Sequence, residues 1–305
     1  MAGIDVTPQA NGVAPQAARK QRSRASLART AFMAILRRDI WVTWREFIPF
    51  LLQVLVQPLF FLFIFGKVLP NLSNSGTSGG FGNAFTILLL PGIVGLTAFT
   101  TALQGVTLPL VLDLGFAREI DDRLQSPLPV SMVALEKVVF ATLRGIVGGA
   151  VIFPLAYLIL GNSFQVRTDA IPQLIGTMIL VAMAGSTVGL TIGTLVRPEQ
   201  ISLLFALILT PLLFTGCTYY NWSGLSTIKW FQIVTLFNPL TYGSEGMRAT
   251  MMPPVTANIP INGQLVPETI TIPTMDPQWI FLGLGVAIVL FFILGIRTFR
   301  ARVVS

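Results

Sequence analysis

The stretch FIPFLLQVLVQPLFFLFIFG, residues 47–66, contains twenty residues and no Asp, Glu, Lys or Arg. A helix rises about 1.5 Å per residue and the hydrocarbon core of a bilayer is about 30 Å thick, so this stretch is long enough to span a membrane. Five similar runs follow at residues 85–112, 138–160, 171–196, 201–220 and 279–296. Their length and uniform apolarity favour helices over the alternating strands of a membrane barrel. The sequence therefore predicts an all-α integral membrane protein with six transmembrane helices.

The composition of the whole chain agrees with this prediction. The 305 residues are 53% hydrophobic and 11% charged, whereas soluble domains are roughly a quarter charged. The chain has no His and a single Cys, Cys217, which excludes imidazole catalysis, His-ligated metal and an intrachain disulfide. It also lacks a P-loop and a G-x-S-x-G motif. We therefore expect that the chain is not an enzyme, binds no cofactor and cannot hydrolyse ATP alone.

The distribution of Lys and Arg predicts the orientation in the membrane. With the N-terminus inside, fifteen of these residues lie in cytoplasmic segments, four lie outside, and Arg144 lies within a span. The positive-inside rule then places both termini in the cytoplasm, as in a multi-pass protein of a bacterial cell membrane. Residues 1–25 contain no apolar signal region and are expected to form a disordered cytoplasmic tail.

Three segments between the spans have their own patterns. Residues 26–46 are amphipathic and too charged to span, so we expect a helix along the cytoplasmic surface, either as a plain anchor or with a further role. The loop 113–137 is the densest charged stretch between spans. It is interpreted as a solvated loop or as a short docking helix that ends near Pro127. In the outer segment 251–278, Asn262-Gly263 between apolar residues predicts a small hairpin.

A few polar residues fall within the predicted spans. Arg144 either snorkels to the cytoplasmic headgroups or belongs to a pathway or an intersubunit contact. Gln53 and Gln57 are four residues apart, so they share one helix face, where they either line a polar cavity or strengthen helix packing; packing is favoured. Glu245 and Arg248 have helical spacing, which suggests a helix that dips into the membrane and returns, shielded by protein or facing water.

Four passages of the chain form a recognisable ordered set. They are the Gln57-Pro58 to Gly66 end of the first span, Leu90-Pro91-Gly92 in the second, the loop from Arg118-Glu119 to Ser131, and Asn238-Pro239-Leu240-Thr241-Tyr242 followed by Arg248. This set resembles the ABC-2-type permease family, and within it the drug-resistance branch typified by daunorubicin export permeases. Together the four passages cover about residues 30 to 300, in the order and spacing of the family. The transmembrane domain is accordingly expected at residues 47–300.

The resemblance implies half of an exporter for a hydrophobic or amphipathic compound, such as a drug, lipid or glycolipid. Two copies, or two related permeases, would assemble with two ATP-binding cassette subunits that carry ATP and Mg. Residues 26–46 would be a connecting helix, and residues 118–131 a coupling helix that seats in the cassette. The coupling residues would be Arg118, Glu119, Asp121, Asp122, Arg123, Leu124, Ser126 and Pro127. An outer gate of re-entrant helices would contain Asn238, Pro239, Tyr242, Glu245 and Arg248. Apart from the resemblance, Gln53, Gln57 and Arg144 are the candidates for lining a pathway, because they are polar residues within predicted spans.

Two other interpretations remain open at this point. An ion-coupled secondary transporter needs a carboxylate within the membrane for a proton relay, and Glu245 is the residue nearest to that role. A membrane scaffold or a lipid-modifying enzyme is the third possibility, although the sequence shows no cluster of catalytic groups. ATP dependence separates the first interpretation from the second.

Overall fold

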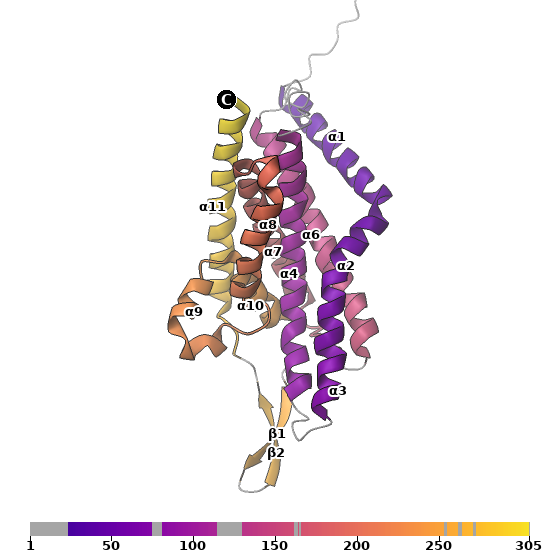
Figure 1. The fold of residues 1–305 in the computed structure, drawn as a ribbon, viewed down its shortest axis with the longest axis vertical. Coiled ribbons are helices and arrows are strands. Elements are labelled where there is room, and N and C mark those ends of the chain that lie inside the picture. Colours follow the sequence, from indigo (N-terminus) through magenta and orange to yellow (C-terminus); the bar gives the residue numbers. More distant parts are fainter. Residues whose placement is uncertain are drawn as a thin grey trace, which may run out of the picture.

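The computed structural model describes residues 24–74, 81–114, 130–161, 164, 166–252, 255–261, 264–270 and 273–304. Long helices run side by side along one axis, and a hairpin projects from the end opposite the C-terminus (Figure 1). In chain order the elements are α1 (Arg24–Arg45), α2 (Phe47–Phe63), the π-helix η1 (Ile64–Val68), α3 (Leu69–Asn74), α4 (Phe81–Leu112), α6 (Val130–Leu160), α7 (Ile171–Leu195), η4 (Pro198–Gln200), α8 (Ile201–Thr215), η5 (Ser223–Thr227), α9 (Lys229–Thr235), α10 (Pro239–Met251), β1 (Val255–Ile261), β2 (Gln264–Ile270) and α11 (Pro277–Val304).

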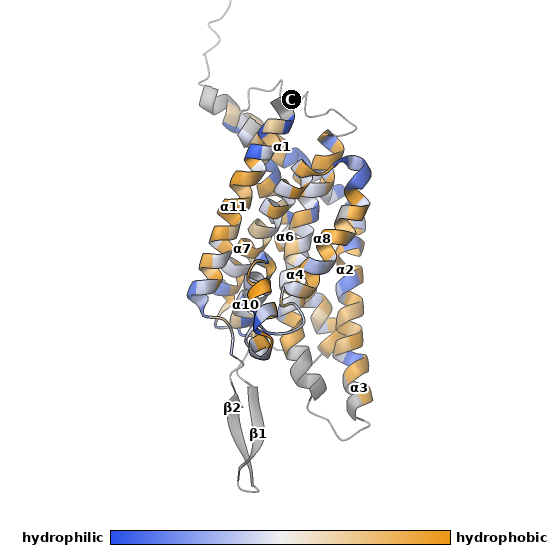
Figure 2. Ribbon diagram, turned by 60° about the vertical axis from the view of Figure 1, so that its left-hand side comes forward, coloured by the Kyte–Doolittle hydropathy of each residue, from blue (hydrophilic) through white to orange (hydrophobic). Residues whose placement is uncertain are grey.

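Six helical stretches in the described part of the chain are long and apolar enough to cross a membrane. Figure 2 shows hydrophobic residues along the length of α2 and α11. The six stretches are Phe47–Val68, Leu88–Leu112, Ser131–Leu160, Ile171–Leu195, Pro198–Thr215 and Pro277–Arg302. The prediction of an all-α membrane protein with six spanning helices is confirmed.

The helix ends differ from the expected ones where tertiary contacts accept a charge or turn the chain. Helix α6 begins at Val130, before the expected start at residue 138, and includes Lys137, whose Nζ lies 2.9 Å from the carboxylate of Asp113. Because this ion pair is largely buried, a charge that looked like a helix boundary is accommodated inside the helix. Helix α8 ends at Thr215 instead of residue 220, and the chain then turns through Cys217, which has a φ of 49°.

The last helix also continues beyond its expected end at residue 296, to Val304. Arg302 donates hydrogen bonds of 2.8 Å to the carbonyl oxygens of Thr194 and Val196 at the end of α7. These carbonyls lie at a helix C-terminus, where they lack partners within the helix, so a cation is favoured there. The basic end of α11 is thereby tied to α7.

Helix α4 forms the centre of the bundle and packs closely on α6 and α7. A Cβ atom at Gly185 or Gly189 of α7 would overlap the carbonyl oxygen of Phe99 or Leu103 of α4. Thr107 of α4 donates a 3.0 Å hydrogen bond to the carbonyl oxygen of Gly189 across the same contact. Small residues and side-chain hydrogen bonds of this kind hold helices together in lipid, where the hydrophobic effect between helices is lost.

Replacing Gly189 with leucine is expected to force α4 and α7 apart, because the new side chain would collide with backbone that cannot move aside cheaply. Overpacking of this kind typically costs about 1–3 kcal/mol or more. The thermal stability of the detergent-purified protein measures the effect. Gly176→Leu on the same helix is the matched control, since a Cβ there meets nothing within 4 Å. Equal stability of both variants would contradict a close α4–α7 contact.

The hairpin expected around Asn262-Gly263 is present. Strands β1 and β2 pair antiparallel from Val255 opposite Ile270 to Ile261 opposite Gln264. Helix α1 meets the bundle through Ala28, which packs in a cluster with residues of α4, α6, α7 and α11. Its Trp41 and Trp44 are exposed. Helix α1 leaves the axis of the bundle at the end that holds the C-terminus (Figure 1).

Candidate functional site

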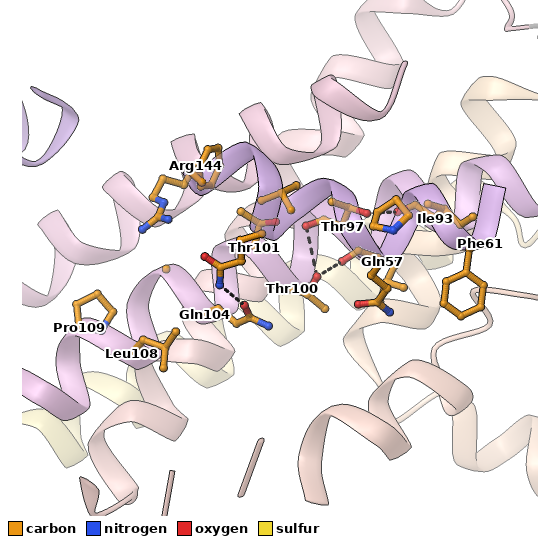
Figure 3. A pocket seen from close by; sticks show the side chains of 16 residues that line it. Gln57, Phe61, Ile93, Thr97, Thr100, Thr101, Gln104, Leu108, Pro109 and Arg144 are labelled. Atoms are coloured by element: carbon orange, nitrogen blue, oxygen red, sulfur yellow. Dashed lines mark hydrogen bonds between the residues drawn. The ribbon is translucent and has the colours of Figure 1, made fainter. Parts of the chain in front are cut away.

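A cavity of about 220 Å³, here called the first cavity, lies between α2, α4 and α6. Its polar lining comes from all three helices and consists of Gln53, Gln57, Thr97, Thr100, Thr101, Gln104 and Arg144. Arg144 lies at one end and Phe61 at the other (Figure 3). The single charge of the lining therefore lies at one end, whereas apolar side chains occur at both ends, with Leu108 and Pro109 on the Arg144 side and Ile93 beside Phe61 (Figure 3).

Hydrogen bonds within this lining leave room for a ligand. Gln53 Nε2 lies 3.5 Å from Gln104 Oε1, which is at the outer limit of a hydrogen bond and links α2 to α4. The hydroxyls of Thr97 and Thr100 donate at 2.8 Å to the carbonyl oxygens one turn earlier, Ile93 and Leu96. Their oxygen lone pairs remain able to accept hydrogen bonds. The amide groups and hydroxyls together could bind both donors and acceptors.

The structure brings Gln53, Gln57 and Arg144 to one cavity, where the sequence had left each with two interpretations. Sequence analysis missed the partners on α4. Thr97, Thr100, Thr101 and Gln104 are spaced i, i+3, i+4 and i+7, which places them on one face of the helix. This polar stripe within an apolar helix was the signal that could have found them.

A second cavity of about 320 Å³ lies next to the first, at the junction of α1 and α2. The two cavities share four lining residues, Phe50, Gln53, Pro109 and Arg144. The second cavity is lined by charges of both signs, namely Arg38, Asp39, Glu46, Asp113, Lys137 and Arg144. The two cavities adjoin at these shared residues, so polar and charged side chains continue from the junction of α1 and α2 into the spanning helices.

Arg144 stands where the two cavities meet. Its guanidinium carbon lies 4.8 Å from the centre of the Phe50 ring, a cation–π contact that joins α6 to α2. Its buried Nε has no hydrogen-bond partner in the described structure. The side chain is only partly buried and is directed into the cavity (Figure 3). Because Nε is buried, donation to a ligand in the cavity would come from the terminal nitrogens of the guanidinium.

The residues expected at an outer gate lie on and beside α10, and two of them, Glu245 and Arg248, form a fully buried pair. The side chains of Glu245 and Arg248 have 0% exposure, and Arg248 Nη1 lies 2.9 Å from Glu245 Oε1. Arg248 also donates to the carbonyl oxygens of Thr218 at 2.8 Å and Leu88 at 3.3 Å. The carboxylate of Glu245 accepts hydrogen bonds from backbone N–H groups at both of its oxygens: Trp222 N at 2.8 Å and Met275 N at 3.2 Å.

This pair joins α10 to α4, to the segment after α8 and to the segment before α11. The carbonyl of Thr218 approaches α4 so closely that a Cβ at Gly92 would overlap it, which is a structural reason for glycine in the Pro91-Gly92 pair. The Glu245–Arg248 ion pair therefore holds α10 in place against α4, the segment after α8 and the segment before α11.

Asn238, Pro239 and Tyr242 fix the start of α10. The side-chain oxygen of Asn238 accepts a hydrogen bond from Leu240 N, so Asn238 is the N-cap, and Pro239 occupies the first turn, where its missing N–H costs nothing. The Asn238 amide nitrogen donates to the Leu212 carbonyl oxygen of α8 at 2.9 Å, and the Tyr242 hydroxyl donates to the Leu236 carbonyl oxygen at 2.9 Å. The position of α10 is thus tied to α8 and to the end of α9.

The expected coupling residues, from Arg118 to Pro127, lie outside the described residues. The structure does describe the two helices that this loop joins, α4 and α6, and both line the first cavity. Among the described residues no group of three or more His, Cys, Asp or Glu side chains is arranged to hold a metal ion.

Comparison with known proteins identifies a family and several similar proteins. The sequence profile of the family described as ABC-2 type transporter matches residues 30–252. The chain is 25% identical over 220 residues to the inner membrane transport permease YadH of Escherichia coli strain K12. This alignment covers 69% of this chain and 80% of that protein. It is 31% identical over 222 residues to ycf38 of Pyropia yezoensis, which is named as a transport permease. This alignment covers 70% of this chain and 72% of that protein. The matched region contains the first cavity and the Glu245–Arg248 pair.

Proposed function

The chain belongs to the ABC-2 type transporter family, and from this premise we propose that it is the transmembrane permease subunit of an ATP-driven exporter. Its cargo is a hydrophobic or amphipathic compound such as a drug, lipid or glycolipid. A second copy or a related permease completes the membrane part, and two cassette ATPase subunits bind ATP and Mg. The observation that carries the proposal is the polar cavity lined by α2, α4 and α6, within a chain that has no ATP-binding motif of its own.

The connection between the cavity and the loop supports a mechanism of coupling. Residues 118–131 lie between the end of α4 and the first turn of α6, and Gln104 and Arg144 of these helices line the first cavity. A force that a cassette applies to the loop is therefore delivered to helices that shape the cavity. Transport requires that the compound bind the inward and outward states with different affinity, because a ligand that binds both equally shifts neither population.

The outer residues support a gate that moves as a unit. Helix α10 is fastened by the Glu245–Arg248 pair, so the segments joined by this pair would move together during release. An ion-coupled mechanism finds little support in the same geometry. Both carboxylate oxygens of Glu245 accept hydrogen bonds and the side chain is fully buried, whereas a proton relay requires exchange with water.

Co-purification followed by transport measurement tests the proposed function. The protein is isolated from its native membrane, and a cassette ATPase is expected in equal amount. Reconstituted vesicles should accumulate compound only when ATP is present on the cassette side. Transport that persists without ATP and follows an ion gradient would overturn the proposal in favour of a secondary transporter.

We further propose a bacterial cell-membrane protein with residues 1–25 and the C-terminus in the cytoplasm, with α1 along its surface and α9, α10 and the hairpin toward the outside. The native Cys217 makes this orientation easy to test, because the residue is fully buried and burial raises the pKa of its thiol to about 11. At pH 7.5 the thiol is protonated and shielded, so we expect no reaction with maleimide in the folded protein.

Introduced cysteines then report the two sides without background. With an impermeant maleimide, whole cells carrying Thr227→Cys should be labelled, whereas cells carrying Glu199→Cys should be labelled only after lysis. Both positions are exposed. The reverse pattern would contradict the orientation, and labelling of Cys217 in the native protein would contradict its burial.

A further inference from the structure

We infer that the compound entering the first cavity carries an anionic headgroup that pairs with Arg144. This inference rests on the proposed function and adds to it the charge of the cargo. Among the residues that line the first cavity, all of which the structure describes, Arg144 is the one charged side chain. The remaining polar groups are the amides of glutamine and the hydroxyls of threonine. The first cavity therefore presents one positive charge to a ligand.

The position of Arg144 in the membrane makes an anionic partner favourable. A charge among spanning helices is unfavourable unless it is paired or reaches water. Arg144 also lines the second cavity, where the carboxylate of Glu46 acts on its charge and the Lys137–Asp113 pair neutralises itself, but no carboxylate lines the first cavity. An anion in the first cavity would supply the opposite charge that the lining lacks.

The guanidinium is arranged for recognition of an oxyanion. The guanidinium carbon lies 4.8 Å from the centre of the Phe50 ring, and the side chain is only partly buried at the cavity, so its terminal nitrogens are the groups that a ligand would meet. A planar guanidinium presents its N–H groups in a fork that fits a carboxylate, phosphate or sulfonate, and these charge-assisted hydrogen bonds are strong. Gln53 and Gln104 could add hydrogen bonds to the same headgroup.

The size and polarity of the cavity favour an amphiphile over a small soluble anion. A volume of about 220 Å³ is below the ~300–1,000 Å³ of sites that enclose a drug-sized molecule, so we expect the headgroup to be enclosed and the rest to extend beyond. The end opposite Arg144 is lined by Phe61 and Ile93 (Figure 3). An apolar chain extending from the headgroup would continue toward that end.

Binding of defined lipids to the purified protein tests the inference. Affinities for phosphatidylglycerol, phosphatidylcholine and free glycerol phosphate are measured by native mass spectrometry. We expect phosphatidylglycerol to bind more tightly than phosphatidylcholine and Arg144→Gln to weaken its binding about tenfold, as loss of a charge-assisted hydrogen bond implies. Arg197→Gln is the matched control: it removes an exposed arginine that lines neither cavity and should leave the affinity unchanged.

The relative affinities decide whether Arg144 binds an anionic headgroup. Equal affinity for the two lipids, or an unchanged affinity in Arg144→Gln, would overturn the inference and indicate that Arg144 snorkels to surrounding lipid. Free glycerol phosphate that binds as tightly as the lipid supports the anionic headgroup and assigns it to a soluble source.

A second measurement does not depend on the stability of the variant. A photoactivatable phosphatidylglycerol, with the reactive group close to the headgroup, should label peptides of α2 and α4 in the unmodified protein; labelling confined to the outer faces of α8 and α11 would overturn the inference. Because these measurements use the permease alone, they remain distinct from the proposed function, which fails separately if no cassette ATPase co-purifies.

Discussion

Replacing Arg248 with methionine is expected to destabilise the protein severely, by about 3–5 kcal/mol, because it leaves the buried carboxylate of Glu245 without its partner. The carbonyl oxygens of Thr218 and Leu88 also lose a hydrogen-bond donor. Thermal unfolding of the purified protein and the fraction that elutes as a single species in size-exclusion chromatography measure the loss.

The paired substitution separates charge from hydrogen bonding. Glu245→Leu combined with Arg248→Met removes both charges, so it should cost less than the two single substitutions added together. It should still destabilise the protein, because Trp222 N and Met275 N lose their acceptor. A melting temperature of Arg248→Met equal to that of the unmodified protein would refute the role of the pair as a fastening.

Replacing Arg118 with glutamate is expected to reduce transport by more than tenfold while leaving membrane insertion intact. If residues 118–131 dock on a cassette ATPase, a reversed charge at the contact is repelled, and such juxtapositions cost several kcal/mol. Transport into vesicles, cassette binding and stimulation of ATP hydrolysis are the measurements.

Two further variants sharpen this test. Glu119→Arg reverses the neighbouring charge and should produce the same loss of coupling. Arg197→Glu introduces an equal charge change at an exposed position between α7 and α8, outside the loop, and should transport normally. Normal cassette binding and ATPase coupling in Arg118→Glu would show that residues 118–131 do not couple the permease to the cassette.

Much of the fold followed from local sequence, and the exceptions have physical causes. The spans could be predicted because each apolar run is long enough to cross the bilayer and, as a helix, forms its backbone hydrogen bonds within itself, independently of the rest of the chain. The third apolar run was expected to begin at residue 138 because Lys137 carries a charge, whereas α6 begins at Val130. Lys137 is accommodated within the helix by its ion pair with Asp113, and this pair depends on α4 and α6 lying side by side. The end of α8 at Thr215 could not be predicted either, because Cys217 and Thr218 are apolar enough to continue a span.

The candidate site was predicted in part. Gln53, Gln57 and Arg144 were identified because polar groups within apolar runs are conspicuous, but their common cavity depends on how α2, α4 and α6 pack. Thr97, Thr100 and Thr101 were missed because threonine is compatible with an apolar helix and can satisfy its hydroxyl within the same helix, as Thr97 and Thr100 do. Gln104 was as visible in the sequence as Gln53 and Gln57 but was not singled out.

The sequence alone determined that this chain is a membrane protein with six spans and no ATP-binding motif, because hydrophobic length and motif spacing are properties of contiguous residues. Only the tertiary structure decided what the scarce polar groups do. Glu245 and Arg248 could have faced water or a proton path, yet contacts from α4, from the segment after α8 and from the segment before α11 enclose them completely. Arg144 instead lies at a cavity with donor capacity remaining, because burial and pairing depend on which distant helices meet.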